Sequence, residues 1–373
     1  MKTKYTIQDI FLKYGSEYTK THKLSKEQWK VYNAIRKCKT KELGIHTMTC
    51  QKCKKVYTSF NSCRDRHCPM CQSYKREQWI EKQTKNLLNC PYFHIVTTVP
   101  AELNEIALFN QKIFYNILFK ATSESILELA NDDKWLGAKV GITSILHTWG
   151  SSMEFHPHIH SIVTGGGLKD NEWISSKDNY LFKVQVLSSL FRGKFLGLLK
   201  DNIKNLVFKD DMKHLSNLDD FNDFLRPLYN KDWITYIEPP KGSPENVIEY
   251  IGRYAFRVAI SNNRIIDIDD NTITFEYKDY RDNGNIKIME LNALEFIRRF
   301  LLHVLPKSLT KIKHYGLLAN SIKSKLLIKC RTLISRITTT PIYSNKKKRT
   351  PKLFTCSCGS SDFNFYYAYP MRS

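Results

Sequence analysis

Residues 138–164 limit the possible folds of this chain more than any other segment, because two strand-like runs there are joined by a very short break. "KVGITSILHTWG" and "EFHPHIHSIVTGGG" meet at a Gly150-Ser151-Ser152 breaker. Parallel strands need a crossover of a dozen or more residues, so these two strands must pair as an antiparallel hairpin centred near Met153. The segment therefore predicts an antiparallel sheet.

The rest of the chain alternates strand-like runs with amphipathic helical runs. After residue 91, strand-like runs such as "FHIVTTVP" and "WITYIEPP" are followed by helix-like runs such as "SPENVIEYIGRYAF". Pro244 at a first helical position, followed by an acidic residue, marks the start of the last of these helices. The sequence predicts an α+β fold in which helices pack on a mainly antiparallel sheet.

Three of the 11 histidines stand at alternate positions of the second hairpin strand. Side chains alternate between the faces of a strand, so His156, His158 and His160 share one face. A polar edge strand that carries histidines by chance is the alternative, but a metal site is the preferred interpretation, because imidazole is the commonest metal-ligand side chain. Strand residues two apart are separated by about 7 Å, so one ion cannot bind both His156 and His160. The hairpin sets His147 opposite the His158–His160 pair, which predicts three converging imidazoles with open positions, as in a catalytic metal site.

Two C-x-x-C pairs lie in the N-terminal region. They are separated by 14 residues and are Cys50–Cys53 and Cys68–Cys71. Each pair supplies two thiolates on a tight turn, and two such turns close a tetrahedral zinc site. A redox C-x-x-C is the alternative, but only a metal requires two matched pairs. We therefore expect one structural zinc ion bound by these four cysteines.

Other donors lie near these pairs or near the end of the chain. Cys63, His67 and His46 either replace a cysteine or bind a second ion, or they are ordinary surface or buried residues, which is the simpler interpretation. Cys356 and Cys358 form a C-x-C that no second pair follows. We assign these last two cysteines no metal.

Charge and composition limit the class of partner. Lys and Arg outnumber Asp and Glu by 58 to 36, a formal net charge of +22. Such an excess is typical of proteins that bind nucleic acid, and the 20 Tyr, 20 Phe and 6 Trp suit stacking on unpaired bases. No apolar run approaches the roughly 20 residues of a membrane span, and the first residues lack the apolar core of a signal peptide. We expect a cytoplasmic protein, nucleoid-associated when bound to DNA, whose cysteines are not structural disulfides.

A pair of tyrosines stands in the helix-like run after Pro244. Tyr250 and Tyr254 are four residues apart, hence on one face of a helix and about 6 Å apart along its axis. Arg253 and Arg257 flank the pair with charge suited to DNA phosphate. The usual meaning of such spacing is an aromatic stripe that faces the core. In a basic chain with a three-histidine site, a pair of nucleophiles is the preferred interpretation.

These motifs together resemble a known family. "HPHIH" after "HTWG", "YIGRY" downstream and "NSCRDRHCPMCQ" upstream are similar to the two-tyrosine HUH transposases of bacterial insertion sequences, the rolling-circle insertion-sequence ninety-one group related to Helitrons. The resemblance extends from residues 46–71 to "RFLLHVLPKSLTKIKHYGLLAN". The matching positions are His158 and His160 of the His-hydrophobic-His motif, and Tyr250 and Tyr254 of the tyrosine pair.

The resemblance implies an HUH endonuclease-like fold, a divalent metal ion and single-stranded DNA at transposon ends and target as substrate. It implies an enzyme that nicks and rejoins one strand through a 5′-phosphotyrosine link in rolling-circle transposition. Because that link stores the energy of the broken bond, rejoining needs no nucleotide cofactor, and the sequence has no P-loop pattern. Imidazole-rich ligation favours Mn²⁺ over Mg²⁺, whereas cellular abundance favours Mg²⁺.

The expected organisation has three regions: a helical and zinc-binding DNA-binding domain over 1–90, an HUH catalytic domain over 91–279, and a helical and basic tail over 280–373. A rolling-circle replication initiator or relaxase would use the same chemistry for another purpose. A zinc-containing nucleic-acid-binding regulator without catalysis would explain the cysteines and the charge, but it leaves the histidine hairpin and the paired tyrosines without a role.

Overall fold

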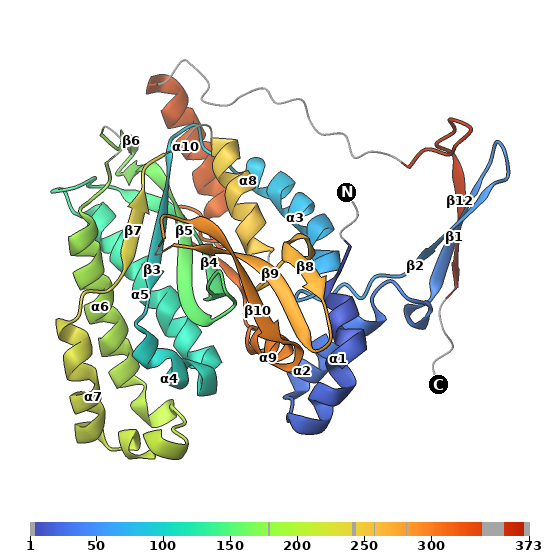
Figure 1. Ribbon diagram of the computed structural model, residues 1–373. Helices are drawn as coiled ribbons and strands as arrows, with labels where there is room; N and C mark the ends of the chain where they lie inside the picture. Colours follow the sequence, from blue (N-terminus) through green and yellow to red (C-terminus); the bar gives the residue numbers. More distant parts are fainter. Residues whose placement is uncertain are drawn as a thin grey trace.

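The computed structural model describes residues 4–177, 180–240, 244–256, 258–280, 282–337 and 354–368. The strands of its largest sheet are β3 (Tyr92–Thr98), β4 (Lys139–Trp149), β5 (Phe155–Lys169), β6 (Glu172–Ser175), β7 (Thr235–Glu238) and β11 (Ile312–Gly316). Their order is β11-β4-β5-β3-β7, and β6 pairs with β5 (Figure 1). Every pairing in this sheet is antiparallel. The predicted α+β fold on an antiparallel sheet is confirmed.

Helices lie on both faces of this sheet (Figure 1). On one side are α4 (Asn104–Phe109), α5 (Gln111–Asn131), α6 (Val184–Asp201) and α7 (Leu218–Asn230), and on the other are α3 (Pro69–Thr84), α8 (Pro244–Ala255) and α10 (Lys323–Ile337). The alternation of strand side chains divides the core accordingly. Ile95 and Val163 pack in one hydrophobic cluster with Ile126 of α5. Ile162 packs in another with Ile248 of α8.

The N-terminal helices belong to a second layer of the fold. Helices α1 (Ile7–Thr21) and α2 (Lys26–Lys37) start at capping boxes formed by Thr6 and Ser25, which satisfy free amides of each first turn. They share a hydrophobic cluster with α9 (Ala293–Leu302) and with a three-stranded sheet, β8 (Ile265–Ile268), β9 (Thr272–Asp279) and β10 (Asn285–Asn292). Helices α1 and α2 of the first expected region, 1–90, thus pack directly on residues 258–304.

The other expected boundary, at residues 279 and 280, lies between β9 and β10. These two strands pair along their whole length, from Asn285 opposite Asp279 to Asn292 opposite Thr272. The hairpin therefore joins the end of the expected catalytic region to the start of the expected tail. Short 3-10 helices are distributed along the chain, at Lys41–Leu43, Ala101–Leu103, Ile203–Asn205, Asp210–Ser216 and Asn262–Arg264.

A small third sheet stands apart from the body of the molecule (Figure 1). Its strands are β1 (Ile45–Cys50), β2 (Val56–Phe60) and β12 (Phe363–Ala368), in the order β12-β1-β2. Both pairings are antiparallel, so strands from near the two ends of the chain lie side by side. Across all described residues, no helix has the length and apolar character that crossing a membrane requires.

Candidate functional site

The β4–β5 hairpin has the register that the sequence predicts. His147 lies opposite His158, and Ile145 lies opposite His160. The turn is closed by a hydrogen bond from the Gly150 amide to the Glu154 carbonyl, with Met153 buried at its tip in a left-handed conformation (φ 63°). A register shift between His147 and Trp149 follows the histidine row.

Three histidines of this hairpin converge on one face of the sheet. The ligand nitrogens of His147, His158 and His160 all lie within 4.8 Å of one another, and Nε2 of His158 is 3.1 Å from Nε2 of His160. His147 is 2% exposed. His156 stands at the outer end of the row, with its ring 5.2 Å from that of His158, and is not a member of this group. The structure thus brings together the three histidines chosen from the sequence.

Hydrogen bonds behind the histidines limit which ring nitrogens carry protons. Nδ1 of His158 lies 2.7 Å from the carbonyl oxygen of His156 and must donate to it. Nδ1 of His160 lies 2.8 Å from Nε2 of His94, and Nδ1 of His94 lies 3.1 Å from a carboxylate oxygen of Glu238. If Glu238 is ionised and His94 neutral, His94 donates to Glu238 and accepts from His160.

This arrangement leaves two lone pairs facing each other. Nε2 of both His158 and His160 becomes an acceptor, and the two atoms are only 3.1 Å apart. Burial lowers the pKa of His158 to about 3 and that of His160 well below its ordinary value, which keeps both rings neutral near pH 7. Neutral imidazoles with facing lone pairs are the donor state that a divalent cation binds. The residues therefore fit a metal ion.

A lysine and a tryptophan lie beside the histidine group. The Trp149 ring stacks on the His147 ring at 4.8 Å, and the Lys311 ammonium lies 4.6 Å from the centre of the Trp149 ring. Burial lowers the pKa of Lys311 to about 7. Sequence reasoning missed Lys311, His94 and Glu238, because each comes from a strand or loop distant from the hairpin in the sequence. The sequence did contain a signal for His94 and Glu238, because both are polar residues in the strand-like runs "FHIVTTVP" and "WITYIEPP".

Helix α8 covers the sheet face that carries the histidines. Ile162 follows His160 by two residues in β5, so both point to the same face, and Ile162 packs in one cluster with Ile248 of α8. Gly252 of α8 permits close contact with α3, because a Cβ there would lie 2.6 Å from the Ile80 side chain. The helix begins at Pro244, as predicted.

The predicted tyrosine pair is in this helix. Tyr250, Arg253 and Tyr254 belong to α8, but their side chains lie outside the described part of the structure, and Arg257 lies outside it entirely. Their roles therefore stay predictions.

The four cysteines predicted to share one zinc ion do not come together, and that grouping is corrected here. Cys68 and Cys71 stand at the start of α3, whereas Cys50 and Cys53 stand at the end of β1 in the outlying sheet. The first four-thiol group consists of Cys38, Cys63, Cys68 and Cys71. Cys38 was missed because it ends helix α2 without a C-x-x-C partner.

The first cysteine group has the dimensions of a zinc site. Sγ of Cys71 lies 3.5 Å from Sγ of Cys38 and 3.6 Å from Sγ of Cys63. Zn–S bonds of about 2.3 Å in a tetrahedron place the sulfurs about 3.8 Å apart. A disulfide would need about 2.05 Å. These residues therefore fit a structural zinc ion.

The first C-x-x-C pair, Cys50 and Cys53, lies beside the two cysteines near the end of the sequence. Cys50 and Cys53 form a second four-thiol group with Cys356 and Cys358. From the sequence we assign Cys356 and Cys358 no metal, but their position in this group contradicts that assignment. Sequence reasoning had no local signal for this pairing, because about 300 residues separate the two halves.

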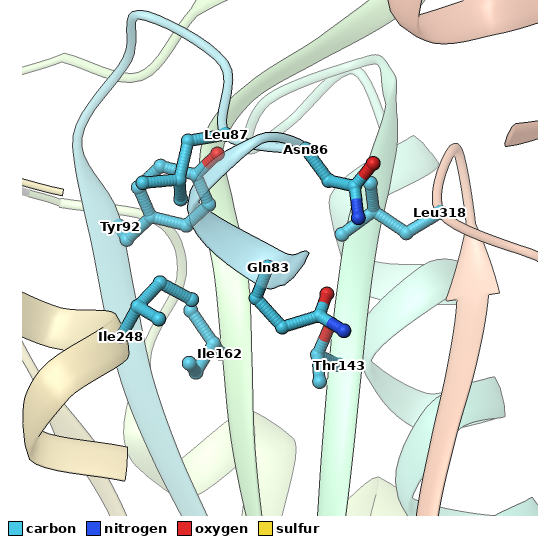
Figure 2. A pocket seen from close by; sticks show the side chains of 8 residues that line it. All are labelled: Gln83, Asn86, Leu87, Tyr92, Thr143, Ile162, Ile248 and Leu318. Carbon is cyan, nitrogen blue, oxygen red and sulfur yellow. The ribbon is translucent and has the colours of Figure 1, made fainter. Parts of the chain in front are cut away.

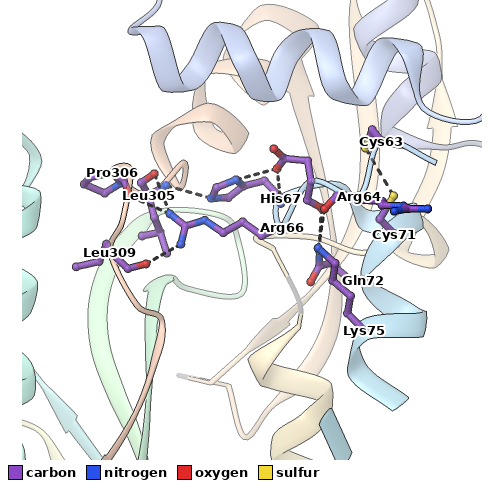
Figure 3. Close-up of polar contacts among 11 residues, drawn as sticks. Cys63, Arg64, Arg66, His67, Cys71, Gln72, Lys75, Leu305, Pro306 and Leu309 are labelled. Atoms are coloured by element: carbon purple, nitrogen blue, oxygen red, sulfur yellow. Dashed lines mark hydrogen bonds and ion pairs between the residues drawn. The ribbon is translucent and has the colours of Figure 1, made fainter. Parts of the chain in front are cut away.

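His67 and Arg66 have structural partners (Figure 3). The Leu305 amide donates to Nε2 of His67 at 3.1 Å, so Nδ1 carries the proton and donates to Asp65 at 3.1 Å. The Arg66 guanidinium donates to backbone carbonyls of residues 305, 306 and 309, at 2.7–3.2 Å. These bonds attach the 63–71 loop to the segment before β11, so His67 is no zinc ligand in this arrangement. His46 hydrogen-bonds Asn61 and is in neither cysteine group.

A small cavity lies on the same side of the sheet as α8 (Figure 2). Its lining residues are Gln83, Asn86, Leu87, Tyr92, Thr143, Ile162, Ile248 and Leu318. None of the three grouped histidines lines it. The cavity is mainly apolar and belongs to the contact between the end of α3, α8 and the sheet.

The chain is similar to known transposases and to their domains. Residues 10–99 match a family model described as a transposase zinc-binding domain, and residues 141–325 match one described as a putative transposase. A putative transposase (y4qJ) of Sinorhizobium fredii is 43% identical over 88% of this chain and 84% of its own length. The transposase for insertion sequence element IS801 of Pseudomonas savastanoi pv. phaseolicola is 27% identical over 85% of this chain and 74% of its own length. No solved structure matches the chain significantly.

The two matched segments include the first cysteine group and the histidine hairpin. A transposase acts on DNA, which agrees with the net charge of +22. By its relatives and by both family models, the chain belongs to the two-tyrosine transposases of the insertion-sequence ninety-one group, DNA-cleaving and strand-transferring proteins with an N-terminal zinc-binding domain.

Proposed function

We propose that this transposase nicks and rejoins single-stranded DNA at the ends of its element, with a tyrosine as nucleophile and a divalent ion at the histidine group. The observation that supports this most is the convergence of His147, His158 and His160 on the sheet face that α8 covers. Helix α8 carries Tyr250 and Tyr254. Metal ligands and candidate nucleophiles therefore belong to neighbouring elements of one face.

The three histidines would hold Mn²⁺ or Mg²⁺. When bound, a divalent ion would supply Lewis-acid chemistry there by polarising a phosphoryl oxygen of the scissile phosphate. The chain itself contributes orientation: the Glu238–His94–His160 series and the His156 carbonyl hold the two Nε2 atoms toward each other.

The proposed cleavage step exchanges one phosphoester for another. The phenolic oxygen of a tyrosine attacks the phosphorus in line, and the bond from phosphorus to the 3′ oxygen breaks. The phenol loses its proton, and the departing 3′ oxygen gains one. The products are a 5′-phosphotyrosine link and a free 3′-hydroxyl, so the reverse attack by a 3′-hydroxyl rejoins a strand without a nucleotide cofactor.

Two tyrosines suit a rolling-circle reaction. One keeps the donor 5′ end covalently bound while the other cuts a second strand, which a single tyrosine must do in turns. Arg253 and Arg257 flank the pair in the sequence and are proposed to bind DNA phosphate.

The zinc ion of the N-terminal domain has a separate, structural role. We infer that Cys38, Cys63, Cys68 and Cys71 hold it, because their sulfurs are spaced for tetrahedral coordination. Three of these residues are buried, so the ion would link α2, the 63–71 loop and α3 within the protein.

A denaturing gel tests the proposed function. The protein is incubated with labelled single-stranded oligonucleotides that carry the element ends, with Mn²⁺ or Mg²⁺. We expect a covalent protein–DNA adduct and a shorter product with a free 3′-hydroxyl. Duplex DNA of the same sequence and samples with chelator should give neither. Binding without an adduct in either metal would instead favour a non-catalytic nucleic-acid-binding protein.

Glu238→Gln tests the orienting series behind the histidine group. Loss of the carboxylate removes the charge that holds His94 and, through it, His160, and changes of this kind cost about 10- to 100-fold in metal affinity. We expect the metal concentration for half-maximal cleavage to rise by about that factor, while the rate at saturating metal changes much less.

Glu172→Gln is the matched control, because Glu172 is exposed in β6 of the same sheet. Its metal requirement should equal that of the unmodified protein. If Glu238→Gln instead lowers the saturated rate and leaves the metal requirement unchanged, Glu238 does not act by positioning the ligand.

A further inference from the structure

We propose that Cys50, Cys53, Cys356 and Cys358 bind a second structural zinc ion, which fastens the C-terminal strand β12 to the N-terminal β1–β2 hairpin. The four Sγ atoms lie within 4.8 Å of one another. Sγ of Cys50 is 3.6 Å from Sγ of Cys358, and Sγ of Cys53 is 3.4 Å from Sγ of Cys356. These spacings are near the roughly 3.8 Å edge of a zinc–thiolate tetrahedron.

Each cysteine pair stands on a tight turn that points its thiols inward. In the first turn the Lys54 amide donates to the Cys50 carbonyl, and Lys54 is left-handed at φ 60°. In the second turn the Gly359 amide donates to the Cys356 carbonyl, and Gly359 has φ 83°. Two turns with a left-handed residue directly after the last cysteine are the knuckle geometry of a closed structural zinc site.

In the part of the outlying sheet whose side chains the structure describes, there is no hydrophobic core that would stabilise it without a metal. Among the described residues 45–60 and 354–366, Cys50 and Cys356 are the buried ones, and the rest are partly or fully exposed. Val56, Phe60, Phe365 and other large apolar side chains of these strands are 43–59% exposed. Small sheets without an apolar core need a metal, a disulfide or a partner. The burial of two of the four thiols indicates the metal.

Contacts around the thiols complete a small shell. The Tyr57 hydroxyl lies 3.2 Å from Sγ of Cys356 and accepts from the Ser357 amide at 3.1 Å. The Tyr57 ring packs against Phe354 at 4.8 Å and against Phe363 at 6.1 Å. Tyr57 of β2 thus contacts residues on both sides of the C-terminal turn, so the site joins all three strands.

This site takes only two of its four ligands from the segment that matches the zinc-binding domain. The matched zinc-binding domain covers residues 10–99 and so contains only Cys50 and Cys53 of the four ligands. Cys38, Cys63, Cys68 and Cys71 already form a complete four-thiol group in the body of the protein. The second ion therefore depends on ligands from the far end of the chain, and this inference does not rest on the proposed nuclease chemistry.

The zinc content of the full chain tests the proposal. It is measured in a His158→Ala/His160→Ala background protein, in which the histidine group can hold no ion. Elemental analysis should give about two zinc ions per chain. Cys356→Ser/Cys358→Ser should reduce this to about one, because the remaining pair cannot close a tetrahedron. Cys53→Ser, at an exposed position, should cause the same loss. Cys330→Ala removes a buried thiol outside both groups and should keep both ions.

Amide exchange gives a second readout that does not depend on metal analysis. Gln51 donates its amide to the Asp362 carbonyl across the β1–β12 pairing. In Cys356→Ser/Cys358→Ser this amide should exchange at least about ten-fold faster, while amides of β5 keep their protection. About one zinc ion in the background protein, or two in the double-cysteine variant, would overturn the proposal. Unchanged exchange at Gln51 would also contradict it.

Discussion

Replacing His158 with alanine is expected to reduce DNA cleavage by about a thousand-fold or more, and His160→Ala should do the same. Lewis-acid stabilisation of the scissile phosphate contributes several kcal/mol, and each 1.36 kcal/mol corresponds to a factor of ten in rate. The two Nε2 atoms stand 3.1 Å apart at the centre of the group, so loss of either leaves an incomplete site. Binding of single-stranded DNA should be nearly unchanged, because Lys and Arg contacts to phosphate provide most of the affinity.

His156→Ala is the matched control for these variants. It removes an imidazole from the same strand, while the backbone carbonyl that accepts from His158 remains. Cleavage should continue at close to the normal rate. His147→Ala should raise the metal concentration needed for cleavage. Full activity of His158→Ala or His160→Ala at low metal would exclude these residues from the site, and an unchanged metal requirement of His147→Ala would exclude His147.

The histidine hairpin could be predicted because its determinants are local. Alternation along β5 sets which side chains share a face, and the short turn at Gly150–Glu154 sets which residue of β4 lies opposite. Together they place His147 against His158 without any information from the rest of the chain. The start of α8 at Pro244 is local in the same sense.

The grouping of the cysteines could not be predicted in this way. The prediction grouped two C-x-x-C motifs because they are neighbours in the sequence. In the folded protein, each motif instead lies beside cysteines that other elements bring to it. Cys38 reaches Cys68 and Cys71 only because α2 packs beside the start of α3, and Cys358 reaches Cys50 only because β12 pairs with β1. The Glu238–His94–His160 series is also non-local, since it crosses three strands. Contacts between strands distant in the sequence depend on the whole fold.

Replacing both Tyr250 and Tyr254 with phenylalanine is expected to abolish the covalent protein–DNA adduct. A phenol with a pKa near 10 is a poor nucleophile unless a metal ion or a base assists it, so only a tyrosine that reaches the histidine group can react. Both residues belong to the helix that lies on that face of the sheet. Removal of the serine nucleophile of a protease costs roughly a million-fold in rate, and a loss of that size here would put the adduct below detection.

The two single variants separate cutting from transfer. Tyr250→Phe and Tyr254→Phe should each still nick a single strand and form an adduct, because one hydroxyl remains. Complete transfer needs one bound 5′ end and a second cut at the same time, so both single variants should accumulate the nicked intermediate.

Phenylalanine keeps the aromatic ring and removes only the hydroxyl. The double variant should therefore fold and bind DNA normally, and these two measurements are its controls. If the double variant still forms an adduct, the nucleophile lies elsewhere. Tyr236 is then the first residue to test, because it pairs with Val96 in the row that contains His160 and is 53% exposed. Tyr277 would follow, although it packs against the hydrophobic cluster beneath α9. If only Tyr236→Phe abolishes the adduct, the nucleophile is in strand β7 and not in α8, and the proposed role of the histidine group is unchanged.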